Sequence, residues 1–144
     1  MLGFLFCVIA GAAMSVQGVM NTRLGAHIGA MQANALVQWT AALLSLLPLA
    51  FARGGGLAAL GGTPKLYWCG GALGLVITLT VMLGIRALSP TVAVSVILIA
   101  QLLVAAGIDA LGLMESEKVA FRWPQIAGAA LMIGGVLLFR LRRT

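Results

Sequence analysis

Residues 91–113 read TVAVSVILIAQLLVAAGIDALGL, and Asp109 is the only charged side chain in this run. An α-helix needs about 20 predominantly apolar residues to cross a bilayer, so the run is long enough to do so. Similar runs cover residues 2–22, 31–52, 66–85 and 124–140. They lack the period-two alternation of barrel strands. The sequence therefore predicts an all-α membrane protein, a bundle of five transmembrane helices forming a single domain over residues 1–144.

The composition also favours a membrane protein. Of the 144 residues, 62% are hydrophobic and 8% are charged, and the mean hydropathy is +1.12. A soluble domain carries about 25% charged residues, three times this share. We therefore expect the lipid bilayer to be the surroundings of the chain.

The basic residues give the chain a formal net charge of +6 and lie near the ends of the predicted spans. This placement suits lipid headgroups and not a nucleic acid, which we do not expect as a partner. Five of the nine would lie on one side of the membrane (Arg23, Arg86, Arg140, Arg142, Arg143) and four on the other (Arg53, Lys65, Lys118, Arg122). Because this bias is small, the sequence predicts insertion in both orientations and an antiparallel homodimer of dual topology.

Local signals mark where the spans begin and end. Thr63-Pro64 and Ser89-Pro90 each place a capping hydroxyl before a proline, which predicts the start of a helix. Trp123-Pro124 opens the last span. The first span is expected to end where Arg23, Gly25, His27 and Gly29 interrupt the apolar run, which would leave His27 in a connecting loop.

Glycines recur at intervals that place them on one face of a helix. The pairs are Gly11 and Gly18, Gly25 and Gly29, Gly70 and Gly74, and Gly128 and Gly135. Small residues at such intervals let neighbouring helices approach closely, and we expect seams of this kind. The alternative is that glycine is merely common in membrane spans.

Polar side chains inside the spans are the candidate functional residues, since they must face the bundle or a cavity. Two amide pairs have a spacing of four residues and so share a helix face, and a third span adds a glutamine and an aspartate. The set is Gln17, Asn21, Asn34, Gln38, Gln101 and Asp109. If they converge, they line a substrate pathway. The alternative is that each amide holds helices together by a hydrogen bond worth about 1 kcal/mol.

Asp109 is the only acidic residue inside a predicted span. A carboxylate in that environment is costly unless it is paired or protonated, which makes Asp109 a candidate proton or cation site. The alternative is a structural position at the membrane interface.

Enzyme and metal motifs are not found in the sequence. Cys7 and Cys69 lie in apolar runs without a CxxC spacing, and His27 is the only histidine. No HExxH, GxSxG or phosphate-binding glycine loop is present. We expect neither catalysis nor a metal or other cofactor.

Four motifs across the chain resemble the YdcZ-like family of the drug/metabolite transporter superfamily. They are Gln17-x-x-x-Asn21-x-x-Leu24-Gly25, Trp68-Cys69-Gly70-Gly71-x-x-Gly74, Gln101 followed by Ile108-Asp109-x-x-Gly112, and Ile126-x-Gly128-x-x-Leu131-Met132-x-x-Gly135. The resemblance implies a five-helix, multi-pass protein of the bacterial inner membrane, half the size of ten-helix members of the superfamily. It also implies that the chain acts with a second copy of itself or with a paired half-size homologue.

The sequence thus predicts an inner-membrane transporter of a small molecule. The alternative function is an accessory or assembly subunit of a membrane complex that transports nothing itself.

Overall fold

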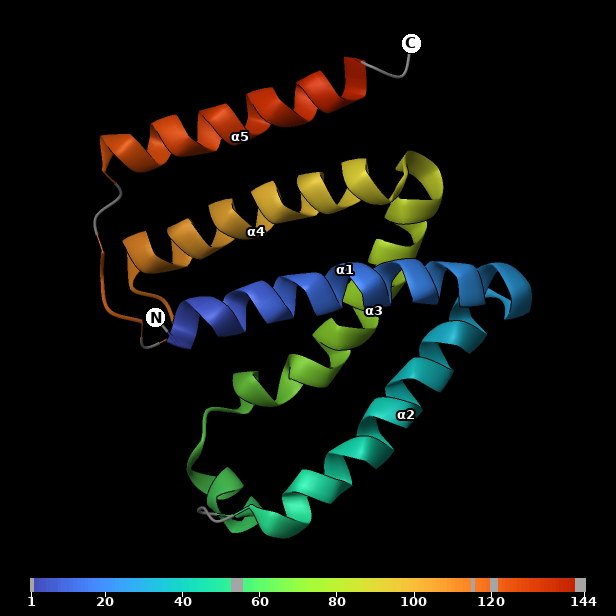
Figure 1. The fold of residues 1–144 in the computed structure, drawn as a ribbon. Coiled ribbons are helices and arrows are strands. Elements are labelled where there is room, and N and C mark those ends of the chain that lie inside the picture. The colour runs from blue at the N-terminus through green and yellow to red at the C-terminus, as the bar shows by residue number, and fades with distance from the viewer. Residues whose placement is uncertain (1, 53–55, 115, 120–121, 142–144) are drawn as a thin grey trace. The chain divides into compact units, whose positions relative to one another are not determined.

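The computed structural model describes residues 2–52, 56–114, 116–119 and 122–141 (Figure 1). Within these ranges the chain forms α-helices and short 3₁₀ segments and no β-strand. The elements are α1 (Leu2–Ile28), α2 (Ala30–Phe51), η1 (Leu57–Gly62), η2 (Lys65–Cys69), α3 (Gly70–Leu88), α4 (Pro90–Leu111) and α5 (Trp123–Leu141). The predicted all-α fold is confirmed.

Four helical segments are long and apolar enough to cross a membrane. They are Leu2–Ile28, Ala30–Phe51, Lys65–Leu88 and Pro90–Leu111, while the described apolar part of α5, Trp123–Leu138, is shorter. Large apolar side chains cover the outside of these helices, and the buried hydrophobic residues are few. A water-soluble fold does not leave so much contiguous apolar surface exposed, so these surfaces suit contact with lipid.

The chain divides into two compact units, Met1–Ala87 and Leu88–Thr144. The first unit contains α1 to α3 and the second contains α4 and α5. Each unit is described by itself below.

One residue, Gly29, connects α1 and α2 in the first unit (Figure 1). Its N–H donates to the carbonyl oxygen of Gly25 and its own carbonyl accepts from Ala33, both at 3.0 Å. Its φ of +93° lies in a region that glycine adopts readily, so the chain reverses there. The expected break near Arg23 and His27 was wrong, because α1 continues to Ile28. Charged side chains interrupt an apolar pattern without interrupting a helical backbone.

Two glycines of α1 form a seam with α3. A Cβ built on Gly18 would lie 3.0 Å from Ile85 Cδ1 and 3.1 Å from Val81 Cγ1, and one built on Gly25 would lie 3.4 Å from Met82 Sδ. Ile85 and Met82 are buried in this contact. The absence of side chains at Gly18 and Gly25, seven residues apart, is therefore what lets α3 side chains reach the α1 backbone.

The other predicted glycine pairs do not act as seams among the described residues. A Cβ on Gly11, Gly70, Gly128 or Gly135 would meet nothing within 4 Å, while one on Gly74 would lie 3.5 Å from Gln38 Nε2. Spacing places glycines on one face but does not say whether another helix lies against that face.

The predicted helix starts are right in part. Ser89 is the N-cap residue of α4 with Pro90 following it, but the Ser89 side chain makes no capping hydrogen bond. Thr63 does not cap a helix start: its hydroxyl donates to the carbonyl oxygen of Leu60 at 2.9 Å and accepts from Trp68 Nε1 at 3.0 Å. A 3₁₀ segment follows, and α3 begins only at Gly70.

In the second unit α4 and α5 lie side by side and run in opposite directions (Figure 1). Gly112 ends α4 with a φ of +64°, and the N–H of Leu113 donates to the carbonyl oxygen of Ile108 at 3.0 Å. This arrangement is a Schellman motif. At the start of α5, Gln125 Oε1 accepts the N–H of Arg122 at 2.5 Å, which satisfies a donor that the helix leaves free.

Candidate functional site

Two of the predicted amide residues lie in the interior of the first unit. Asn21 of α1 is 8% exposed and Asn34 of α2 is 3% exposed. Asn34 Oδ1 is buried and accepts no hydrogen bond within the described part of the chain. A buried acceptor without a partner costs about 1–3 kcal/mol, so this amide is not explained by its contribution to stability.

Gln17 and Asn21 line one hollow on α1, as their spacing of four residues predicts. Its other lining residues are apolar or small: Ile9, Ala12, Ala13, Val16 and Met20. The Gln17 side chain is exposed there, whereas Asn21 is buried. The amide pair therefore runs from an open surface into the interior of the unit.

Gln38, the second amide of α2, lies beside α3. Its Nε2 would be 3.5 Å from a Cβ on Gly74, and its side chain is half-buried. A polar group that approaches a glycine backbone in this way lies at a helix contact and not on a free outer face.

Gln101 and Asp109 of α4 line two different hollows. Gln101 is grouped with Ala100, Val104, Ala105 and Ile108, whereas Asp109 lines a cavity between α4 and α5. Ala105 contributes to both. Gln101 and Asp109 thus do not share a cavity, although their hollows share Ala105. The convergence of all six pathway residues stays a prediction.

The cavity between α4 and α5 has a volume of about 440 Å³. Its lining combines small residues of both helices with larger apolar residues. The apolar lining residues are Leu102, Ala105, Ala106, Val119, Gly128, Ala129 and Met132. Sites for small molecules commonly have volumes of about 300–1,000 Å³ and mostly apolar walls, so this cavity is of a size that can hold a ligand.

Asp109 and Gln125 are the polar residues that line this cavity. Asp109 is near the end of α4 and Gln125 is near the start of α5, so both belong to the end of the helix pair at which the 112–122 connection lies. Asp109 makes no ion pair with any described residue.

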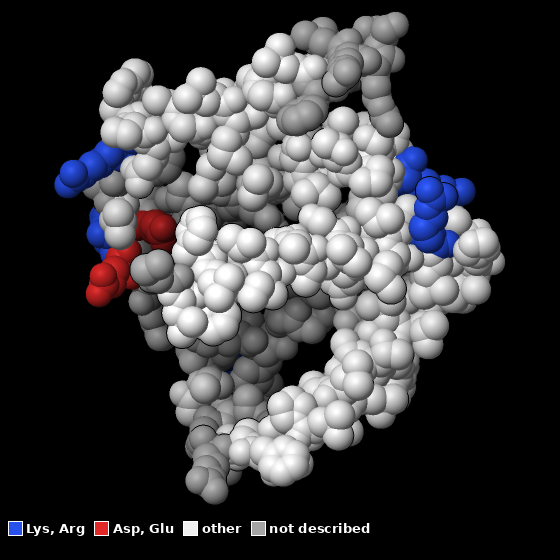
Figure 2. Space-filling model, in the orientation of Figure 1, with Lys and Arg blue, Asp and Glu red and all other residues white. Residues whose placement is uncertain are grey.

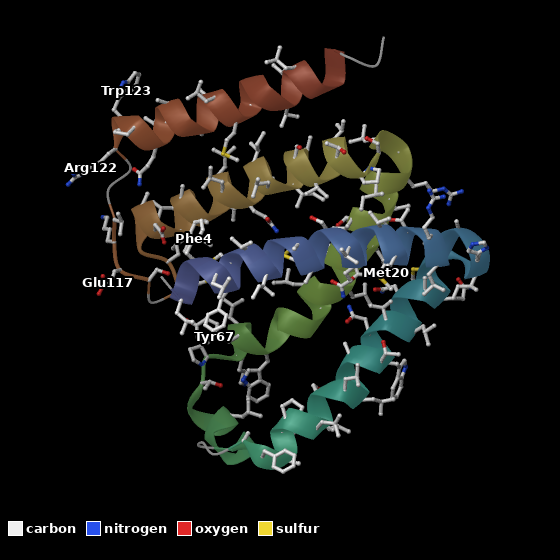
Figure 3. The ribbon with its side chains drawn as sticks, viewed as in Figure 1. Phe4, Met20, Tyr67, Glu117, Arg122 and Trp123 are labelled. Atoms are coloured by element: carbon white, nitrogen blue, oxygen red, sulfur yellow. The ribbon has the colours of Figure 1, made fainter. Side chains whose placement is uncertain are left out.

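Two other charged residues of the connection, Glu117 and Arg122, point away from the helix pair (Figure 3). Figure 3 shows Glu117 and Arg122 directed outward, with Trp123 at the start of α5. In Figure 2 the acidic atoms gather at this end, next to basic ones, while the surface along the helices is white. Asp109 is thus the charged residue of the cavity wall.

The role of α5 in the cavity was missed at the level of sequence. Gln125, Gly128, Ala129 and Met132 recur at intervals of three and four residues, which places them on one helix face. That periodicity can be seen in the sequence, but the sequence does not show which helix packs against this face of α5.

The structure holds no candidate metal centre in its described ranges, where no group of three or more His, Cys, Asp or Glu side chains lies together. Cys7 and Cys69 are free and exposed.

Apolar helices of membrane-spanning length define the class as a multi-pass helical membrane protein, and its interior amides are candidate functional residues. The family model described as "Putative inner membrane exporter, YdcZ" matches residues 2–138. The chain therefore belongs to the YdcZ family of membrane transport proteins. The searches of curated proteins and of solved structures gave no match.

Proposed function

We propose that this chain is an inner-membrane transporter of a small molecule and that it works as an antiparallel pair of identical chains. Family membership over residues 2–138 supports transport. The observation that carries the proposal is Asn34, whose Oδ1 is buried in the α1–α2 unit without a hydrogen-bond partner among the described residues. A polar group kept at a cost inside a membrane helix marks a pathway more often than a packing contact.

The proposed pathway uses the polar residues of both units. Gln17 and Asn21 lead from the surface of α1 to its buried face, and Gln101 and Asp109 line hollows on α4.

The distribution of acids supports the antiparallel arrangement. Consecutive spans alternate direction, so Asp109, Glu115 and Glu117 belong to one membrane side together with four basic residues. The opposite side has five basic residues and no acid. A parallel pair places two strongly basic ends side by side, whereas an antiparallel pair places each beside the end that holds the acids.

The accessory-subunit alternative accounts for the fold but gives no reason for the buried amide of Asn34. A subunit that only holds a complex together gains nothing from an acceptor without a partner. The genomic neighbourhood also distinguishes the two functions. An adjacent gene for a second half-size copy favours a paired transporter, and a neighbouring gene for a large enzyme or channel favours an accessory role.

The orientation of the C-terminus tests the pairing. We suggest replacing Cys7 and Cys69 with alanine, placing a single cysteine by Thr144→Cys, and labelling intact cells with a membrane-impermeant maleimide. Dual topology predicts that about half of the cysteines react, and that the remainder react only after detergent is added. Labelling that is complete or absent in intact cells would show a single orientation and reject the antiparallel pair.

A further inference from the structure

The cavity between α4 and α5 extends over two helical turns. On α4, Leu102 and Asp109 are seven residues apart, and on α5 so are Gln125 and Met132. At 1.5 Å per residue each interval is about 10 Å long. Because the helices run in opposite directions, the polar residues of both lie at one end and the apolar residues Leu102 and Met132 at the other.

The polar end is anionic. Asp109 is exposed within the single chain and has no cationic partner among the described residues. Gln125 Oε1 is occupied by the N–H of Arg122 at the start of α5, so the amide oxygen is already used. Lys118 and Arg122 are exposed on the connection, and the negative charge of Glu117, also exposed there, offsets one of their two positive charges. The charge that a ligand meets in the cavity wall is therefore that of the Asp109 carboxylate.

The connection between the helices fixes Asp109 in place. The carbonyl oxygen of Asp109 accepts the N–H of Gly112 at 3.4 Å and that of Val119 at 2.9 Å. Val119 itself lines the cavity. Asp109 thus supplies the charge of the wall, and its backbone carbonyl holds Val119, another residue of that wall.

We infer that this cavity binds an organic monocation with an apolar body about 10 Å long, its charge at Asp109 and its apolar part toward Leu102 and Met132. The inference rests on the proposed transport function and names the substrate class of that function. A cation gains the attraction of the carboxylate, a neutral solute does not, and an anion meets its repulsion. A fully polar cation leaves the apolar end of the cavity unfilled.

The test uses octyltrimethylammonium, which has a permanent charge and an eight-carbon chain. Its binding to the purified full chain is measured by isothermal titration calorimetry in a neutral maltoside detergent, with protein-free micelles subtracted. Octyl sulfate, which has the same chain and the opposite charge, is the paired probe. We expect saturable binding of the cation and no saturable binding of the anion.

Two variants locate the site. Asp109→Asn keeps the shape and removes the charge, and we expect the cation to bind at least tenfold more weakly. Gly128→Leu fills the cavity, since a Cβ there meets nothing within 4 Å, and we expect saturable binding to be lost. Gly135→Leu is the matched control: it lies on the same face of α5, is equally open and does not line the cavity. It should bind as the original chain does, and thermal melting checks that all three remain folded.

The outcomes separate this inference from the proposed function. Absent cation binding in the original chain, or equal binding in Asp109→Asn and Gly128→Leu, overturns the inference. If cysteine labelling at Thr144 still shows both orientations, the paired transporter stands without this substrate class. Conversely, cation binding that needs Asp109, combined with no movement of the cation into vesicles that contain the chain, supports the site and counts against transport.

Discussion

The backbone N–H of Val119 donates to the carbonyl oxygen of Asp109 at 2.9 Å. The two residues are ten positions apart, and the chain between them leaves α4 at Gly112 and returns to the end of the same helix. This bond joins the wall of the α4–α5 cavity to the residue that gives it charge. Changes at the end of α4 should therefore affect both stability and the cavity.

Gly112→Ala should destabilise the chain. Gly112 has a φ of +64°, and a Cβ there would lie 3.4 Å from Lys118 Cβ, so alanine would meet both backbone strain and a close neighbour. We expect a loss of about 1–2 kcal/mol in the free energy of unfolding. The measurement is denaturant unfolding in detergent followed by helical circular dichroism. The control is Gly107→Ala, inside the last turns of α4, where a Cβ meets nothing within 4 Å. It should be neutral or stabilising by up to about 1 kcal/mol. Equal effects at both positions would contradict the role of the αL turn.

Gly18→Leu should disrupt the contact between α1 and α3. The space that a side chain needs at Gly18 is taken by Ile85 and Val81. Overpacking of this kind costs about 1–3 kcal/mol. Gly11→Leu is the matched control on the same helix, because nothing lies within 4 Å of a Cβ there. Thermal melting of the two variants should differ clearly, and identical melting temperatures would mean that Gly18 is not part of a seam.

Asn34→Leu should leave stability unchanged or raise it while reducing transport. The substitution removes a buried oxygen without a partner and keeps a similar volume, and the removed desolvation cost is about 1–3 kcal/mol. An amide that holds helices together predicts the reverse, a clear loss of stability. Melting temperature and uptake of the octyltrimethylammonium probe into vesicles are measured on the same preparation. A destabilised variant that still transports would reject the pathway role of Asn34.

Gln101→Leu should abolish transport with little change in the melting temperature or in the pairing of chains. Its side chain is exposed in a hollow of α4 and makes no hydrogen bond with a described residue, so a leucine removes at most about 1 kcal/mol of interhelical bonding. Val104→Leu in the same hollow serves as the control for added volume. Normal transport by Gln101→Leu would remove this residue from the pathway.

The helices could be predicted from the sequence because apolar runs of this length have one stable form in a bilayer. Their ends could be predicted less well. Arg23 and His27 end an apolar run but lie inside α1, and only the conformation of Gly29 ends that helix. Thr63-Pro64 resembles a helix start, yet the Thr63 hydroxyl is used by Leu60 and Trp68.

The candidate site, too, could be predicted from the sequence only in part. The shared face of Gln17 and Asn21 followed from helical periodicity alone, and the structure places both in one hollow. The cavity lined by Asp109 and Gln125 could not be predicted in this way, because it depends on the register of α4 against α5 and on the path of the connection. Those are tertiary relationships, which a spacing of residues along one helix does not encode.

The single-residue turn at Gly29 also constrains how the chain enters the membrane. Only Gly29 lies between α1 and α2. No hydrophilic loop is therefore available that could remain on one side of the membrane while α1 inserts alone. We therefore expect both helices to enter the bilayer together as a hairpin, with Arg23 and His27 near its turn. Under the proposed dual topology, the choice of orientation would then be made in one step for two spans, early in synthesis.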